Sequence, residues 1–144
     1  MKEIGFALRK INTDEFATVE RDISEGDEVD VQLNVNSGFG INEGNKFIAC
    51  FINLQFELDN IPIIILKINC EFAIEEGAWV SFISKKGKIK FNKKILQHLA
   101  VITVGTARGI LHSKTENTPN NNFFLPTINV SEIILEDESF DLEK

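Results

Sequence analysis

Apolar and polar residues alternate with a period of two over the middle of the chain. Every even-numbered residue from Ile48 to Leu58 is apolar, and the same holds from Ile64 to Ile74. The odd-numbered positions between them are mostly polar or charged. Alternation of this kind is typical of strands that bury one face. The two segments therefore predict a hairpin with one shared buried face, joined around Asp59-Asn60.

Parity fixes the register of this hairpin. In an antiparallel pair, the numbers of paired residues have a constant sum, and paired side chains lie on the same face of the sheet. An odd sum would pair even-numbered with odd-numbered residues and would place half of the charged side chains on the buried face. A turn centred on Asn60 gives an even sum. The predicted pairs are Leu54–Leu66, Phe56–Ile64 and Cys50–Cys70. Two interpretations stay open for the cysteines, namely two small buried thiols or a cross-strand disulfide.

Two shorter alternating segments precede the hairpin. Ile4, Phe6 and Leu8 indicate a first strand, which a polar, acidic stretch follows as far as Asp30. Apolar residues at every second position from Val29 to Val35 indicate a second strand. The glycine-rich sequence NSGFGINEGN, residues 36–45, predicts a loop, and no helical pattern follows it that would suggest a phosphate site.

After Asn92 the hydrophobic period lengthens to three or four residues. Ile95, Leu99, Ile102 and Ile110 share one side of an expected long helix over residues 92–114. A polar loop over residues 115–129 follows, then a short helix over residues 130–138 and an acidic tail over residues 139–144 that we expect to fray. With mainly strands over residues 1–84, the 144 residues predict one α+β domain.

The charge of the chain restricts its partners. The formal net charge is −7, which argues against a general nucleic-acid binder and against adhesion to anionic membranes. The segment KKGKIKFNKK, residues 85–94, carries six lysines and could be a nucleic-acid patch or the solvated basic start of the helix. Its single aromatic residue and the acidic remainder of the chain favour the second interpretation.

The N-terminal residues contain no apolar segment of the secretory type, and no stretch of the chain is long and apolar enough to span a bilayer. We therefore expect a cytoplasmic protein without membrane insertion. In that compartment thiols are reduced, which favours free side chains at Cys50 and Cys70.

Catalytic patterns are missing from the sequence. The two histidines, His98 and His112, would lie about 21 Å apart along a helix and could not share a metal ion. No nucleophile or phosphate-loop motif occurs, and no carboxylate has an apolar setting that would raise its pKa. The sequence thus predicts no catalytic residues, no metal and no cofactor, and hence no enzyme.

Three segments resemble the SecB protein-export chaperone family: IGFALRKINTDEF, IPIIILKINCEFAI and TARGILHSKTENTPNNNFFLPTINV. The last is the most specific, because the family has a helix with Ala-Arg followed by a loop and a Leu-x-Pro-x-Asn-like segment. The matching residues are Ala107, Arg108, Leu125, Pro126 and Asn129. The family's usual Phe-Pro before Ala-Arg is replaced by Val104-Gly105-Thr106.

The resemblance implies a four-stranded antiparallel sheet with one long and one short C-terminal helix on one face, assembled as a homodimer or as a homotetramer built from two dimers. It also implies an ATP-independent holdase that binds unfolded or nascent polypeptides, for protein export with the translocation motor as partner, or as a dedicated chaperone of one partner such as an antitoxin. A non-catalytic structural oligomer and a small enzyme or ligand-binding domain are the rival interpretations.

Apolar residues outside the predicted buried face are the candidate client contacts. They come from the odd-numbered face of the hairpin and from the loop after the long helix, and they are Phe47, Phe51, Ile63, Ile65, Phe123, Phe124 and Leu125. Contiguous exposed apolar side chains usually mark an interaction surface. The alternative for the three loop residues is that they pack onto the sheet as part of the core.

Overall fold

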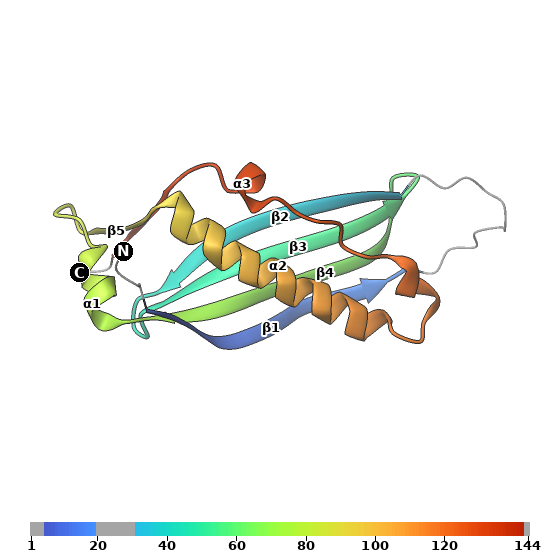
Figure 1. Ribbon diagram of the computed structural model, residues 1–144, viewed down its shortest axis with the longest axis horizontal. Coiled ribbons are helices and arrows are strands. Elements are labelled where there is room, and N and C mark those ends of the chain that lie inside the picture. The colour runs from blue at the N-terminus through green and yellow to red at the C-terminus, as the bar shows by residue number, and fades with distance from the viewer. Residues whose placement is uncertain (1–4, 20–30, 143–144) are drawn as a thin grey trace.

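A computed structural model describes residues 5–19 and 31–142. The predictions for Ile4, for Val29 and for the acidic stretch beyond residue 19 lie outside these ranges. Four long strands form one antiparallel sheet in the order β1-β4-β3-β2 (Figure 1). Their bounds are β1 Phe6–Thr18, β2 Val31–Asn42, β3 Phe47–Leu58 and β4 Ile61–Ile74.

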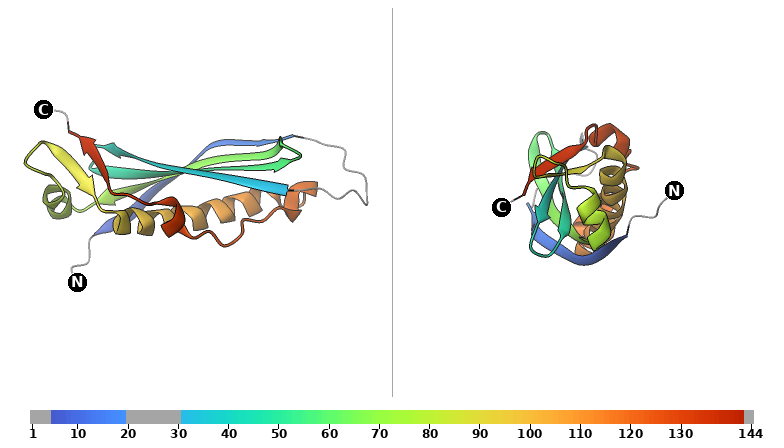
Figure 2. Two further views of the ribbon diagram at one scale, coloured as in Figure 1. Left: turned by 90° about the horizontal axis from the view of Figure 1, so that it is seen from above. Right: turned by 90° about the vertical axis from the view of Figure 1, so that its left-hand side faces the viewer.

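The second half of the chain returns over one face of this sheet. The short helix α1 (Glu76–Ser81) and strand β5 (Lys88–Phe91) lead into the long helix α2 (Lys93–Thr115), which lies across β3 and β4. The chain then runs back beside α2 through η1 (Pro119–Asn122), α3 (Val130–Ile133) and β6 (Glu138–Asp141), so that sheet and helix form two layers (Figures 1 and 2). This architecture confirms the predicted α+β fold.

The register of the hairpin is the predicted one. Leu54 pairs with Leu66, Phe56 with Ile64 and Cys50 with Cys70. The even-numbered residues of β3 and β4 form the inner face, which α2 covers, and they are almost completely buried. Cys50 and Cys70 lie there as free thiols, the first of the two interpretations, and burial raises the pKa of the Cys50 thiol to about 12.

Helix α2 packs onto this face through the neighbouring side of the helix, which carries Leu96, Ala100, Thr103, Ala107 and Leu111. Of the residues predicted to share the apolar side, Leu99 is buried, while Ile95, Ile102 and Ile110 are only half-buried. The first turn of α2 is capped by Asn92, whose Oδ1 accepts the Ile95 N–H at 3.0 Å. The hydroxyls of Thr103 and Thr106 donate to carbonyl oxygens four residues earlier, at 2.8 and 2.9 Å. Because these local bonds satisfy the hydroxyls, a helix with β-branched residues can be buried on the sheet.

The glycine-rich segment predicted to be a loop is largely part of a strand. Residues 36–42 continue β2 instead of forming a glycine-rich loop, since Gly38 pairs with Phe51 and Gly40 with Ala49. A Cβ on Gly40 would lie 3.4 Å from the Phe51 ring, so the absent side chain leaves room for that ring. Strand β1 extends to Thr18 and so includes most of the segment IGFALRKINTDEF, which resembles the first strand of the SecB family.

The predictions for the basic segment and for the acidic tail were also wrong. Both segments contain a short strand, and these two strands pair with each other. Residues 88–91 form β5 rather than the start of a helix, and residues 138–141 form β6 rather than a frayed tail. Lys88 Nζ lies 3.5 Å from Asp141, and Lys90 Nζ lies 3.6 Å from Asp137. The short helix predicted for residues 130–138 is correspondingly limited to Val130–Ile133.

Candidate functional site

A cleft of about 320 Å³ lies between strand β2 and the return segment of the chain. Since β2 is an edge of the sheet, one side of the cleft is a strand edge. The opposite wall is the segment from α3 to the start of β6, and the first turns of α2 contribute to the lining. The lining residues are Ser37, Gly38, Phe39, Leu96 and residues 133–138.

The apolar part of the cleft comes from three elements. Leu96 of α2 is fully buried, Ile134 is 7% exposed, and Phe39 and Ile133 are half-buried. Leu135 stands beside them with 66% of its surface exposed. The cleft thus has an apolar lining that begins in the core and continues outward to an aliphatic side chain in contact with solvent.

The backbone of β2 presents hydrogen-bonding groups to this cleft. Ile74 N–H donates to Lys46 O at 3.0 Å, so even-numbered residues of β3 direct their backbone groups toward β4. In an antiparallel sheet, a residue of β3 whose backbone groups bond to β4 has none left for β2. Its partner residue on β2 therefore directs its own N–H and C=O groups outward, away from β3. Ser37 and Phe39, which pair with Ile52 and Cys50, therefore direct their N–H and C=O groups away from the sheet.

Hydrogen bonds hold the outer wall in place. Gln97 of α2 donates from Nε2 to Ile134 O at 2.8 Å, and Ile134 N–H donates to Val130 O at 2.8 Å. Asn129 caps α3 by accepting the Ser131 N–H at 3.1 Å. The wall is thus fixed to the helix that covers the core and does not close onto β2.

The residues that resemble the SecB family motif support this wall. Arg108 Nη2 donates to Pro126 O at 3.0 Å, Ala107 is fully buried, and Leu125 is 6% exposed within the core. Asn129 is the cap described above. Arg108 and Leu125 thus hold the return segment against α2 and the core ahead of the cleft wall.

The rim of the cleft is acidic, with Glu136, Asp137 and Glu138 in succession. Asp137 Oδ1 accepts the Lys93 N–H at 2.8 Å, which places a carboxylate at the positive end of the α2 dipole. Partial burial raises the pKa of the Glu138 carboxyl, so the prediction that no carboxylate has a setting that raises its pKa was wrong. The rim therefore disfavours acidic ligands and favours neutral or basic ones.

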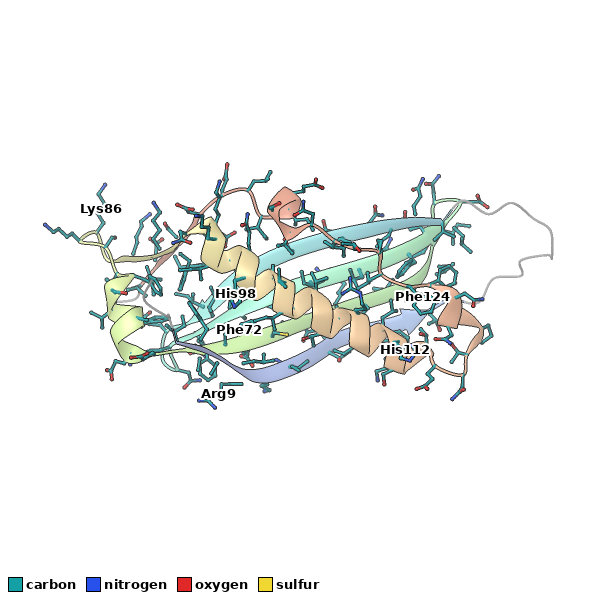
Figure 3. The ribbon with its side chains drawn as sticks, in the orientation of Figure 1. Arg9, Phe72, Lys86, His98, His112 and Phe124 are labelled. Carbon is teal, nitrogen blue, oxygen red and sulfur yellow. The ribbon has the colours of Figure 1, made fainter. Side chains whose placement is uncertain are left out.

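The seven candidate client contacts are divided between the two faces of the molecule, and none of them lines the cleft. Phe47 and Ile65 lie half-buried on the outer face of the sheet, where Phe51 is 37% exposed. Ile63 is only 3% exposed and Leu125 is in the core, so neither is accessible. Phe124 is 64% exposed at one end of the molecule (Figure 3), while Phe123 packs on Phe56 with ring centroids 5.7 Å apart.

A second hollow, of about 410 Å³, lies on the outer face of the sheet. It is larger than the cleft, and both hollows present more polar than apolar surface, but the apolar share is smaller here, where Asn34, Asn36, Asn53, Gln55 and Lys67 surround Ile65. Because apolar burial is the main driving force for capturing unfolded chains, the cleft beside β2 is the better candidate.

The sequence analysis also predicted no metal site and no membrane-spanning segment. Within residues 5–19 and 31–142, no three His, Cys, Asp or Glu side chains gather closely enough to hold a metal ion. His98 and His112 lie far apart along α2 (Figure 3). None of the helices in these ranges is long and apolar enough to cross a membrane.

Comparison with known proteins identifies the fold. No protein-family model matches the chain, and no curated protein matches its sequence. Among solved structures, the chain is similar to a SecB-like chaperone from Mycobacterium tuberculosis in complex with a ChAD peptide from the HigA1 antitoxin. The TM-score is 0.56 at 9% identity, over 85% of this chain and 90% of the other. The shared fold is thus that of a SecB-like chaperone, at a distance where only the fold is comparable.

A protein of unknown function from Streptococcus agalactiae is also similar, with a TM-score of 0.41 and 12% identity. The similarity covers 80% of this chain and 90% of that chain.

Proposed function

We propose that the protein is an ATP-independent chaperone that binds extended, unfolded polypeptide segments in the cleft beside β2. The observation that carries this proposal is the position of an apolar lining directly beside the free edge of a strand. An extended segment could pair its backbone with Ser37 and Phe39 and place every second side chain against Leu96, Ile134 and Leu135.

The expected specificity follows from these two contributions. Backbone pairing does not depend on sequence, and apolar burial contributes roughly 25 cal/mol per Å² whatever the side chain. The cleft should therefore accept many aliphatic and aromatic segments. The acidic rim should favour segments that carry neutral or basic residues and disfavour acidic ones.

A dedicated role for one partner is the second candidate. It is supported by the fold neighbour, whose complex contains a peptide from an antitoxin. The two candidates differ in breadth: a general holdase suppresses aggregation of unrelated proteins, and a dedicated chaperone binds one peptide tightly and leaves other clients to aggregate.

We also propose a homodimer or homotetramer formed through α2. Val101 is 54% exposed on this helix, and a Cβ on Gly105 or Gly109 would contact nothing within 4 Å. A glycine inside a helix costs about 1 kcal/mol relative to alanine, and the described part of the chain does not explain these two. Close approach of a second copy would explain them. The proposed compartment is the cytoplasm.

The test compares two exposed aliphatic residues. Leu135→Ser changes the cleft, and Ile61→Ser changes a residue of 47% exposure in the β3–β4 turn region, away from the cleft. Binding of a labelled unfolded peptide is measured by fluorescence anisotropy, together with light scattering from several thermally aggregating proteins. We expect Leu135→Ser to weaken binding about tenfold and Ile61→Ser to leave it unchanged. Equal effects of the two substitutions would refute the cleft as the binding site.

A further inference from the structure

The end of the molecule that carries α1 and β5 has exposed aliphatic and basic residues that follow one another closely in the chain. Val80 and Ile83 are 60% and 38% exposed, and Lys85 and Lys86 follow directly in the chain. Figure 3 shows Lys86 projecting from this end, with Phe124 at the other end of the molecule. We refer to Val80, Ile83, Lys85 and Lys86 as the basic tip.

The backbone of the basic tip is held in one conformation. Ser84 N–H donates to Lys88 O at 2.7 Å, and Gly87 N–H donates back to Ser84 O at 3.2 Å. Gly87 has a φ of 73°, a left-handed conformation that glycine adopts without strain. Leu142 N–H donates to Gly87 O at 3.1 Å, which ties the turn to the C-terminal segment.

The lysines of this hairpin differ in their surroundings. Lys88 and Lys90 are paired with Asp141 and Asp137. Lys85 and Lys86 form no salt bridge with any residue of the described ranges, although the chain as a whole has a net charge of −7. The acidic residues of this region thus neutralise the strand lysines and leave two positive charges at the turn.

We propose that the basic tip is a docking site for an acidic peptide segment that carries aliphatic side chains. The two free lysines complement carboxylates, and Val80 and Ile83 offer an apolar contact beside them. Because the turn is already ordered, docking requires little further loss of backbone freedom. The site is separate from the cleft, whose rim is acidic, so the two sites would select segments of opposite charge.

A polypeptide fits this surface better than a nucleic acid does. None of the four tip residues is aromatic, so no base could stack there. Two lysines neutralise few phosphates, and the acidic remainder of the chain repels a polyanion. A short acidic segment makes its contacts within the tip and avoids most of that repulsion.

The test uses the full chain and a labelled short peptide of alternating Glu and Leu, with a Gln-and-Leu peptide for comparison. Anisotropy is measured for the unchanged protein and for the double substitution Lys85→Glu/Lys86→Glu. The matched control is Lys10→Glu/Lys114→Glu, which makes the same change of net charge at two exposed lysines outside the tip. Circular dichroism melting confirms that both variants remain folded.

We expect the acidic peptide to bind more tightly than the Gln peptide. The tip substitution should weaken its binding by roughly tenfold or more, and the control should not. Added salt should also weaken binding, since the tip is exposed. Equal loss in the tip variant and in the control, or tighter binding of single-stranded RNA or of anionic vesicles through the same lysines, would overturn the proposal. Failure here is distinguishable from failure of the cleft, because the tip variant should still suppress aggregation.

Discussion

The two edges of the sheet are built differently. Strand β1 shifts its register with β4 twice, between Leu8 and Lys10 and between Thr13 and Glu15. Strand β2 pairs with β3 along its whole length of 12 residues without a shift. Bulges twist an edge strand and reduce its tendency to pair with another chain. The β1 edge is therefore protected by its own irregularity, whereas the β2 edge is straight and borders the cleft at Ser37–Phe39.

Apolar side chains on the inner face also differ in exposure between the two edge strands. Leu8 and Ile11 of β1 pair with buried residues of β4, yet they are 40% and 48% exposed. Phe39 of β2 is half-buried beneath the cleft wall. The return segment thus covers the inner face around Phe39 of β2 and leaves Leu8 and Ile11 of β1 exposed, although Phe6 and Phe16 of β1 pack against the core. We infer that β2 serves peptide capture and β1 does not.

The largest expected effect comes from removing the support of the cleft wall. Leu125→Ala should lower the free energy of unfolding by about 2–4 kcal/mol, because it creates a cavity under the return segment. The neighbouring Phe124→Ala, at a residue that is 64% exposed, should change it by less than about 0.5 kcal/mol. Urea denaturation measures both. Similar losses for the two variants would mean that the wall is not anchored through Leu125.

The direction of the β2 backbone groups can be tested with proline. Gly38 pairs with Phe51, and its N–H points into the sheet, so Gly38→Pro removes a ladder hydrogen bond. We expect the free energy of unfolding to fall by about 2 kcal/mol or more. Ser37→Pro removes a donor that points outward and should leave stability nearly unchanged. The reverse order in urea denaturation would show that the assigned edge is wrong.

The exposed residues Leu8 and Ile11 of β1 should not matter for peptide capture. Replacing Leu8 and Ile11 together by Ser should change the free energy of unfolding by less than about 1 kcal/mol, because both side chains are largely exposed. Light scattering after size exclusion should show an unchanged particle mass, because the oligomer contact is proposed on α2, and peptide binding should be unchanged as well. A loss of peptide binding at unchanged mass would instead assign capture to β1.

The smallest expected effect concerns the rim of the cleft. Burial raises the pKa of Glu138, so the folded state disfavours its ionised form. Its charge therefore reduces stability as pH rises through that pKa, and Glu138→Gln should raise the melting temperature near pH 7 by about 1–2 °C. The difference should disappear at acidic pH, where the carboxyl is protonated. Glu136→Gln, at an exposed position two residues away, controls for net charge.

The sequence predicted those parts of the fold in which local patterning and tertiary packing agree. Even-numbered positions of β3 and β4 are all apolar because α2 covers that face, so parity together with a turn centred on Asn60 predicted the register. Strand pairing between distant segments was not predictable in this way. β5 and β6 are four residues each, and their stabilising ion pairs join residues about 50 positions apart.

The candidate site was predicted less well than the fold. Alternation showed that Phe51 and Ile65 face away from the core, but it could not show which edge is accessible. Gly38 and Gly40 interrupt the pattern of β2, so its edge was mistaken for a loop. The run Ile133–Leu135 followed by acidic residues was the one signal for the cleft wall, and its meaning depends on the position of Leu96.

The central claim, that an extended peptide pairs with the β2 edge, is tested most directly by binding of one unfolded peptide to two proline variants. Ser37→Pro removes an outward N–H of β2, and Ile11→Pro removes the equivalent outward N–H of β1. We expect Ser37→Pro to weaken binding about fivefold or more, with Ile11→Pro unchanged and both variants folded. Unchanged binding in Ser37→Pro, or an equal loss in Ile11→Pro, would contradict peptide capture at β2.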